Sequence, residues 1–243
     1  MAAGRLTRLD DAPDLPESNQ WAEVRSARYP WARPSVAAEI RNWMEEVDHA
    51  DALAAAGEKV MPLMLTGESR CGKTSTMAAI ARHYNIPAFR LEVSAIIGGF
   101  MGDTCKALKS ALDWAAAAPC GLWVLDEVDG IFQQRTSDGQ GANKERNTAL
   151  AVALSVVENL PPHVMLVATT NSPQLVDRAM MARFIRIDFP PWLDLMADER
   201  CRFARSHGGS DEIARQATSY AEVVRRARDA RVRKIIDGST RKT

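Results

Sequence analysis

Residues 67–74 of this chain read GESRCGKT and match the pattern G-x-x-x-x-G-K-[ST] at every fixed position. The apolar run at residues 61–65 predicts a buried strand before this stretch, and the residues from 74 onward predict a helix after it. This order disfavours an ordinary Gly-rich turn, because a loop at a helix N-terminus presents backbone N–H groups to phosphate oxygens. We therefore expect a nucleotide site formed by the loop and the residue after it: Gly67, Glu68, Ser69, Arg70, Cys71, Gly72, Lys73, Thr74 and Ser75.

The composition describes a protein with ample material for a buried core, since 46% of its 243 residues are hydrophobic and 26% are charged. Lys plus Arg and Asp plus Glu each number 31, so the chain as a whole is not attracted to nucleic acid or anionic lipid. No apolar stretch approaches the roughly 20 residues that span a bilayer, and the first residues lack the apolar core of a signal peptide. We expect a cytoplasmic protein that does not act at a membrane.

Strand and helix patterns alternate along the chain after the phosphate loop. The expected strands are 88–93, 121–126, 164–169 and 183–189, and the expected helices between them are 104–118, 144–158 and 174–181. Such alternation is typical of the α/β class, with a parallel five-stranded sheet flanked by helices. After Pro191 the pattern becomes helical. The expected domains are a flexible N-terminal leader at 1–33, a nucleotide-binding domain at 34–190, and a small C-terminal helical lid with a basic tail at 191–243.

A second group of candidate site residues ends the strand LWVLD at 122–126, where Asp126 is followed by Glu127. The carboxyl ends of parallel strands form the edge at which ligands bind in such sheets, so this acid pair should face the phosphate loop. We expect Asp126 and the Thr74 hydroxyl to hold Mg²⁺, and Lys73 to reach the terminal phosphates of ATP. Glu127 would then polarise the attacking water. Alone, the pair would be a solvated strand end, but after a phosphate loop it predicts ATP hydrolysis.

These motifs make the chain resemble an AAA ATPase of the AAA+ superfamily, near the branch that contains protein unfoldases and microtubule-severing enzymes. DEVDGIF at 126–132 is similar to the acidic box of that family, and residues 164–184 resemble its second region of homology. IIGGFMGDTCKAL at 96–108 resembles the central pore loop, and TSYAEVVRRA at 218–227 resembles the start of the last lid helix. The resemblance implies a P-loop NTPase fold, ATP and Mg²⁺ as cofactors, and a closed homo-oligomeric ring that is usually a hexamer.

Two residues of the second region of homology are candidates for catalysis. Asn171 follows an expected strand, where a neutral amide hydrogen-bonds the attacking water or the γ-phosphate; the alternative is a turn residue in Asn-Ser-Pro. By resemblance, Arg183 is the arginine finger that reaches the nucleotide of a neighbouring subunit; the alternative is an exposed structural arginine. The family often has two arginines here, and this chain has Met180 and Met181 where the first would stand.

Phe100 and Met101 are the candidate residues for contact with a substrate. They follow Gly98 and Gly99, and by resemblance this loop lines the pore of a ring and binds extended polypeptide by apolar contact. The alternative is that Phe100 packs against its own domain. Residues 138–143 are expected to form a flexible loop near the same pore.

The chain departs from the commonest family pattern at Arg70 and Cys71, which stand where small residues are usual. Arg70 occupies a backbone position that often prefers glycine, and it is a candidate for contact with phosphate or with a neighbouring subunit. Near the C-terminus, basic residues fall within ten positions: Arg225, Arg226, Arg228, Arg231, Arg233 and Lys234. They form either the solvated face of a lid helix, with Ile235 directed inward, or a nucleic-acid patch; the zero net charge favours the lid helix.

The function that these features predict is an ATPase, which converts ATP to ADP and phosphate in a ring motor that remodels, unfolds or threads a protein substrate. The first alternative is an AAA+ ATPase that acts on nucleic acid, such as a loader or a transposition helper. The second alternative is a nucleotide-gated assembly module with slow turnover. A protein substrate ranks above nucleic acid as the expected partner.

Overall fold

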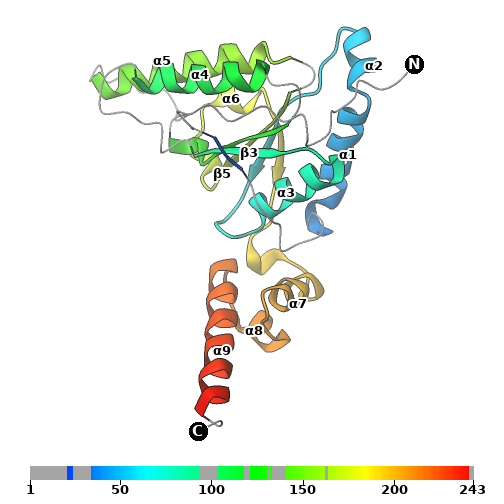
Figure 1. Cartoon of the computed structure of the whole chain (residues 1–243), viewed down its shortest axis with the longest axis vertical. Helices are drawn as coiled ribbons and strands as arrows, with labels where there is room; N and C mark the ends of the chain where they lie inside the picture. Colours follow the sequence, from blue (N-terminus) through cyan, green and yellow to red (C-terminus); the bar gives the residue numbers. More distant parts are fainter. Residues whose placement is uncertain are drawn as a thin grey trace.

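The protein has a sheet domain followed by a group of helices, as Figure 1 shows. A computed structural model describes residues 21–23, 34–92, 103–117, 121–130, 132, 141–161 and 164–240. The strands are β1 (Trp21–Glu23), β2 (Leu63–Thr66), β3 (Ala88–Glu92), β4 (Leu122–Asp126), β5 (Met165–Thr170) and β6 (Ile185–Asp188). They form one sheet in the order β1-β3-β4-β5-β2-β6. The five strands from β3 to β6 in this order are parallel, which confirms the predicted fold class.

The strand register brings several carboxyl ends to one edge of the sheet. Thr66 at the end of β2 pairs with Thr170 at the end of β5, and Leu125 near the end of β4 pairs with Ala168 of β5. The loops that leave β2, β4 and β5 therefore begin side by side. This is the edge at which parallel sheets bind ligands, and it carries both motifs found in the sequence.

Helices cover both faces of the sheet (Figure 1). One face carries α4 (Asp103–Ala117) and α5 (Gly141–Glu158), and the other carries α1 (Ala37–Asp48) and α3 (Lys73–Tyr84). Side chains of β4 alternate between two cores: Trp123 and Leu125 pack toward α4 and α5, and Val124 packs toward α1 and α3. Because both faces of the sheet are buried, β4 has consecutive apolar residues and no alternation of apolar with polar side chains before Asp126.

Two short elements flank α1, and one strand lies in the predicted leader. The 3₁₀ turn η2 (Pro34–Val36) precedes α1, and α2 (Ala50–Ala55) follows it. Within residues 1–33, which were expected to be flexible, Trp21–Glu23 forms β1 and pairs antiparallel with β3. The remainder of that stretch lies outside the described residues.

The chain after the sheet forms a helical lid, comprising η6 (Trp192–Asp194), α7 (Ala197–Ser206), α8 (Asp211–Gln216) and α9 (Tyr220–Thr240). Three aromatic rings make its centre, since the ring centroids of Trp192, Phe203 and Tyr220 lie 5.1 to 5.6 Å apart. The Tyr220 hydroxyl donates a hydrogen bond to the Pro190 carbonyl oxygen at 2.7 Å, which ties α9 to the end of the sheet domain. Among the helices in the described ranges, none combines the length and the apolar composition that a bilayer crossing requires.

Three expectations about individual elements are wrong. The single helix expected at 174–181 is a 3₁₀ turn, η5 (Pro173–Leu175), followed by the short helix α6 (Arg178–Met181). The reason is Asp177, whose carboxylate accepts a hydrogen bond from the Ala179 N–H at 2.8 Å and starts a new helix. The strand expected from residue 183 begins at 185, so Arg183 lies in the turn before β6. Residues 141–143, expected in a flexible loop, belong to α5.

Candidate functional site

The phosphate loop, residues 67–72, connects β2 to α3. Gly67 has φ 138°, and a Cβ added there would lie 2.8 Å from the Phe189 Cβ, so the close approach to the end of β6 requires glycine. Gly72 is the N-cap of α3 and is left-handed, with φ 113°. Arg70 is also left-handed, with φ 66°, a conformation that strains a residue with a side chain. The expectation that Arg70 occupies a glycine-favouring position is confirmed.

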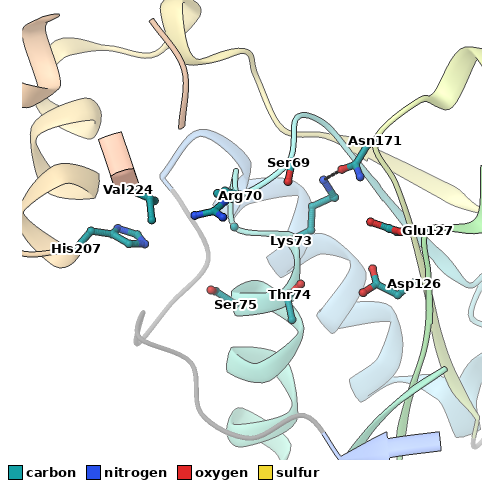
Figure 2. A pocket seen from close by; sticks show the side chains of 11 residues that line it. Ser69, Arg70, Lys73, Thr74, Ser75, Asp126, Glu127, Asn171, His207 and Val224 are labelled. Carbon is teal, nitrogen blue, oxygen red and sulfur yellow. Dashed lines mark hydrogen bonds between the residues drawn. The ribbon is translucent and has the colours of Figure 1, made fainter. Parts of the chain in front are cut away.

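Lys73, the first residue of α3, turns its side chain back into the loop and is 8% exposed. Its ammonium donates hydrogen bonds to the Gly67 and Glu68 carbonyl oxygens at 2.7 and 3.0 Å. It also donates to Asn171 Oδ1 at 2.7 Å, the bond drawn in Figure 2. The structure thus joins two predicted catalytic residues that are 98 positions apart in the sequence.

The acid pair, Asp126 and Glu127, ends β4 and lies across the cavity from the lid (Figure 2). Glu127 is exposed and has φ 55°, so the backbone turns sharply directly after the strand. The 3₁₀ turn η4 (Val128–Gly130) follows. Asp126 is more enclosed, with a side chain that is 16% exposed, and its Oδ2 lies 3.3 Å from Arg90 Nη1 on β3. The two carboxylates therefore have different surroundings although they are adjacent in the sequence.

Thr169 of β5 holds the acid pair in place and was not found from the sequence. Its hydroxyl donates to Asp126 Oδ1 and accepts from the Glu127 N–H at 3.2 Å. Thr169 is fully buried, so its hydroxyl depends on these two bonds for its hydrogen-bond partners. A threonine near the end of an apolar strand carries no motif of its own, and only the register of β4 with β5 indicates its role.

The predicted residues meet in a cavity of about 280 Å³ between the sheet edge and the lid. Its lining is Ser69, Arg70, Gly72, Lys73, Thr74, Ser75, Asp126, Glu127, Asn171, His207 and Val224. Gly67, Glu68 and Cys71 belong to the loop but do not line the cavity, and Cys71 is fully buried in the core. Most of the residues expected to bind a nucleotide therefore line one cavity, which is formed by three loops of the sheet edge and one wall of the lid.

His207 and Val224 form the lid wall of this cavity and were not predicted (Figure 2). His207 follows α7, and its Nδ1 lies 3.0 Å from the Phe203 carbonyl oxygen. This contact is a hydrogen bond in the tautomer that carries its proton on Nδ1, because a carbonyl oxygen can only accept. Its ring also packs on that of Phe203, with centroids 4.3 Å apart. The sequence gives no signal for His207, because the lid must fold back over the sheet edge before this side chain reaches the cavity.

Arg183 does not line the cavity of its own chain. Its guanidinium donates to the Ala179 carbonyl oxygen at 2.6 Å and forms an ion pair with Glu158 at the end of α5. The side chain is 28% exposed, and its buried Nε has no hydrogen-bond partner within the described ranges. Arg183 is thus a partly exposed cation on a different part of the surface from the other predicted catalytic residues.

Two of the basic residues near the C-terminus make contacts within the lid. Arg226 pairs with Glu222, and Arg231 donates to the His207 carbonyl oxygen. Val223 and Ala227 are buried, as expected for a lid helix, but Ile235 is 71% exposed, so its predicted inward orientation is wrong. Phe100 and Met101, the predicted pore-loop residues, lie outside the described residues.

A parallel sheet with a phosphate loop after its first core strand and an acid pair at the same edge defines a P-loop nucleotide-binding domain. Residues 63–191 match the family described as "ATPase family associated with various cellular activities (AAA)". This match covers more than half of the 243 residues, and the chain therefore belongs to the AAA family of ATPases. The prediction of an ATPase domain that binds ATP is confirmed at this level.

Similar proteins agree with this assignment. The chain is 30% identical over 152 residues to an uncharacterised AAA family ATPase, y4kL, of Sinorhizobium fredii. The aligned region covers 62% of this chain and 44% of that relative. It is 28% identical over 156 residues to a proteasome-activating nucleotidase of Thermococcus gammatolerans, covering 62% of this chain and 39% of the relative. It is 28% identical over 147 residues to the ATP-dependent zinc metalloprotease FtsH 3 of a Synechocystis species, and the aligned region covers 59% of this chain and 24% of that relative. The chain thus spans less than half the length of these relatives.

Proposed function

We propose that this chain is the ATP-hydrolysing domain of a ring-shaped motor that remodels, unfolds or threads a protein substrate. The observation that supports the proposal most is that the phosphate loop, the acid pair and Asn171 line one and the same cavity. Each of these comes from a different loop at the carboxyl edge of the sheet, as a site for phosphoryl transfer requires.

The lining of the cavity fits ATP together with Mg²⁺. The Thr74 hydroxyl and the Asp126 carboxylate supply the oxygen ligands that Mg²⁺ prefers, and both line the cavity. When bound, Mg²⁺ would neutralise charge on the phosphate oxygens. The N–H groups of the loop and the Lys73 ammonium bind the phosphates, while His207 and Val224 offer the lid surface against which the base and sugar pack.

Within this arrangement Glu127 is the proposed general base. It is the more exposed of the two acids, and as a carboxylate it accepts the proton of the water that attacks the γ-phosphate. Asn171 orients that water or the γ-phosphate through its amide, which adds no negative charge next to the phosphates. Because Asn171 is hydrogen-bonded to Lys73, a displacement of the phosphate-binding ammonium also moves the amide.

Arg183 is the proposed finger that completes the site of a neighbouring copy. It is a cation outside the cavity of its own chain, and it is held by a surface ion pair with Glu158 and by a hydrogen bond to the Ala179 carbonyl oxygen. Such an exposed ion pair contributes little stability, typically about 0 to 1 kcal/mol. A phosphate group of the nucleotide bound to the neighbouring subunit can therefore displace Glu158 from Arg183 with little loss of free energy. A finger supplied by another subunit requires an oligomer, and a closed ring places one finger at every site.

A protein substrate is proposed because the names of two relatives, a proteasome-activating nucleotidase and an ATP-dependent zinc metalloprotease, refer to action on proteins. The predicted contact residues are Phe100 and Met101, on sequence grounds alone. Replacing Phe100 with Ala should leave ATP hydrolysis in place and abolish remodelling of a tagged test substrate. DNA-stimulated ATP hydrolysis would instead favour the nucleic-acid alternative.

A mixing experiment tests the shared site. Glu127→Gln and Arg183→Ala should each lower ATP turnover by roughly 10³-fold or more when assayed alone, because each removes a group that acts in phosphoryl transfer. Mixed in equal amounts, the two inactive proteins should regain turnover, since some interfaces then combine an intact Glu127 with an intact Arg183. Arg178→Ala is the matched control, because Arg178 is exposed on α6 near Arg183, and it should remain active. Mixtures that stay inactive, while both variants still bind ATP and assemble, would contradict the finger in trans.

A further inference from the structure

A second cavity, of about 570 Å³, adjoins the nucleotide cavity between the phosphate loop and the first turns of α9. Its lining comes from the lid, as Ser219, Ala221, Glu222, Val224, Arg225 and Arg228, and from Arg70 of the loop. Arg70 and Val224 line both cavities. The two spaces therefore meet at these side chains, so a ligand in one lies next to a ligand in the other.

Three cations of this cavity form no ion pair with any other residue that the structure describes. Arg70, Arg225 and Arg228 are exposed, and no ion pair or hydrogen bond to another described residue joins any of their guanidinium groups. The one acid in the lining is Glu222, whose carboxylate already accepts from the Thr218 N–H at 2.8 Å and from Arg226 at 2.6 Å. The cavity thus gathers positive charge, which like-charge repulsion disfavours unless an anion binds there.

The backbone of the loop supports a role for Arg70. Its φ of 66° is a conformation that glycine adopts without strain, so an arginine at this position carries a local conformational cost. Figure 2 shows its side chain directed toward Val224 and His207 of the lid and away from Lys73. Arg225 and Arg228 are three residues apart on α9, and such positions lie on the same side of a helix. Cations from the loop and from the lid therefore converge on one space.

We propose that Arg70, Arg225 and Arg228 form a second anion site, beside the nucleotide cavity, that binds a phosphate group. Guanidinium groups bind phosphate oxygens through paired N–H donors, and three of them around one cavity match a group that carries more than one negative charge. The phosphate is free phosphate or pyrophosphate, because the phosphate loop and Lys73 are the groups proposed to bind the tail of a nucleotide in the adjoining cavity. The site adjoins the proposed nucleotide cavity, but it depends neither on occupancy of that cavity nor on the formation of a ring.

The test compares a double variant, Arg225→Gln with Arg228→Gln, with a matched control, Arg233→Gln with Lys234→Gln. The control residues are exposed on the same helix but do not line the cavity. Isothermal titration calorimetry measures the affinity of each full-length protein for a non-hydrolysable ATP analogue. A second titration measures the affinity for inorganic pyrophosphate, with and without saturating analogue. Circular dichroism checks that each variant is folded.

If the site takes free phosphate, pyrophosphate binds the analogue-saturated protein, and the double variant binds it at least about tenfold more weakly than the control does. If instead the analogue binds about tenfold more weakly to the double variant and the saturated protein takes no pyrophosphate, the arginines serve the nucleotide cavity and the second site is overturned. Equal affinities of the double variant and the control for both probes would overturn the proposal. Failure of the wild-type chain to bind the analogue would contradict the proposed function instead, and the titrations without analogue would still test the anion site.

Discussion

The Thr169 hydroxyl is the contact that a single substitution tests most directly. It bonds both to the Asp126 carboxylate and to the Glu127 N–H, and it is fully buried. Thr169→Val preserves the shape of the side chain and removes both bonds. The Glu127 N–H then loses its acceptor, and Asp126 keeps Arg90 as its remaining charged partner.

The expected loss of stability follows from these two bonds. A hydrogen bond to a charged acceptor is worth about 1.5 to 3 kcal/mol, and a buried donor left unpaired costs about 1 to 3 kcal/mol. Because the Glu127 N–H lies near the exposed end of the strand and water partly satisfies it, we expect a net loss of about 2 to 4 kcal/mol. For a chain of this size that corresponds to a lower Tm by roughly 5 to 15 °C.

The effect on catalysis should exceed the effect on binding. Thr169 contacts neither the loop nor the lid in the bonds described above, so KM for ATP should change by less than about threefold. A displaced general base costs about 100-fold when it moves by 1 Å, so kcat should fall by about 10- to 100-fold. Differential scanning calorimetry measures the Tm, and a coupled assay of ADP release measures kcat and KM.

Thr169→Ser is the matched control, because serine keeps the hydroxyl and loses only a methyl group. It should retain kcat within about threefold while losing roughly 1 kcal/mol of stability, as expected for one buried methyl group. If Thr169→Val has the Tm and the kcat of the wild type, the positioning of the acid pair by β5 is refuted. A drop in Tm with unchanged kcat would leave Thr169 with a structural role only.

Three other substitutions give further tests. Arg70→Gly should raise the stability of nucleotide-free protein by about 1 kcal/mol, or the Tm by roughly 2 to 4 °C, because it relieves the left-handed strain; an unchanged or lower Tm would contradict this. Asn171→Ala should lower kcat by about tenfold or more, with ATP affinity by calorimetry nearly unchanged, since the Lys73 ammonium keeps two carbonyl acceptors. Hydrogen bonds from the Thr218 N–H and hydroxyl, together with Arg226, hold the pKa of Glu222 below its ordinary value of 4.5. The ionised carboxylate therefore stabilises the lid above pH 4.5, and this stabilisation is lost as the pH falls through the lowered pKa. The Tm difference between wild type and Glu222→Gln should accordingly be present at pH 7 and vanish in acid; a difference that persists in acid would contradict the assignment.

The general fold and most of the site could be predicted from the sequence because they depend on short segments. A phosphate loop works through its own backbone, so its pattern and its flanking strand and helix suffice to recognise it. The acid pair and Asn171 each end an apolar run, and the common edge of a parallel sheet brings such ends together. The ends of the elements follow less directly from the sequence. Residues 174–181 look like one helix, but the Asp177 side chain caps α6 and separates it from η5.

The sequence by itself determined the class of this protein, because the loop GESRCGKT and the strand ending in Asp126 and Glu127 carry their chemistry in local order. Only the tertiary structure decided which distant side chains support them. Thr169 reaches the acid pair through strand register, and His207 reaches the candidate nucleotide cavity because the lid folds over the sheet edge. The meeting of Arg70 with Arg225 likewise depends on that packing. Such contacts join residues far apart in the chain, and no local pattern of residues specifies them.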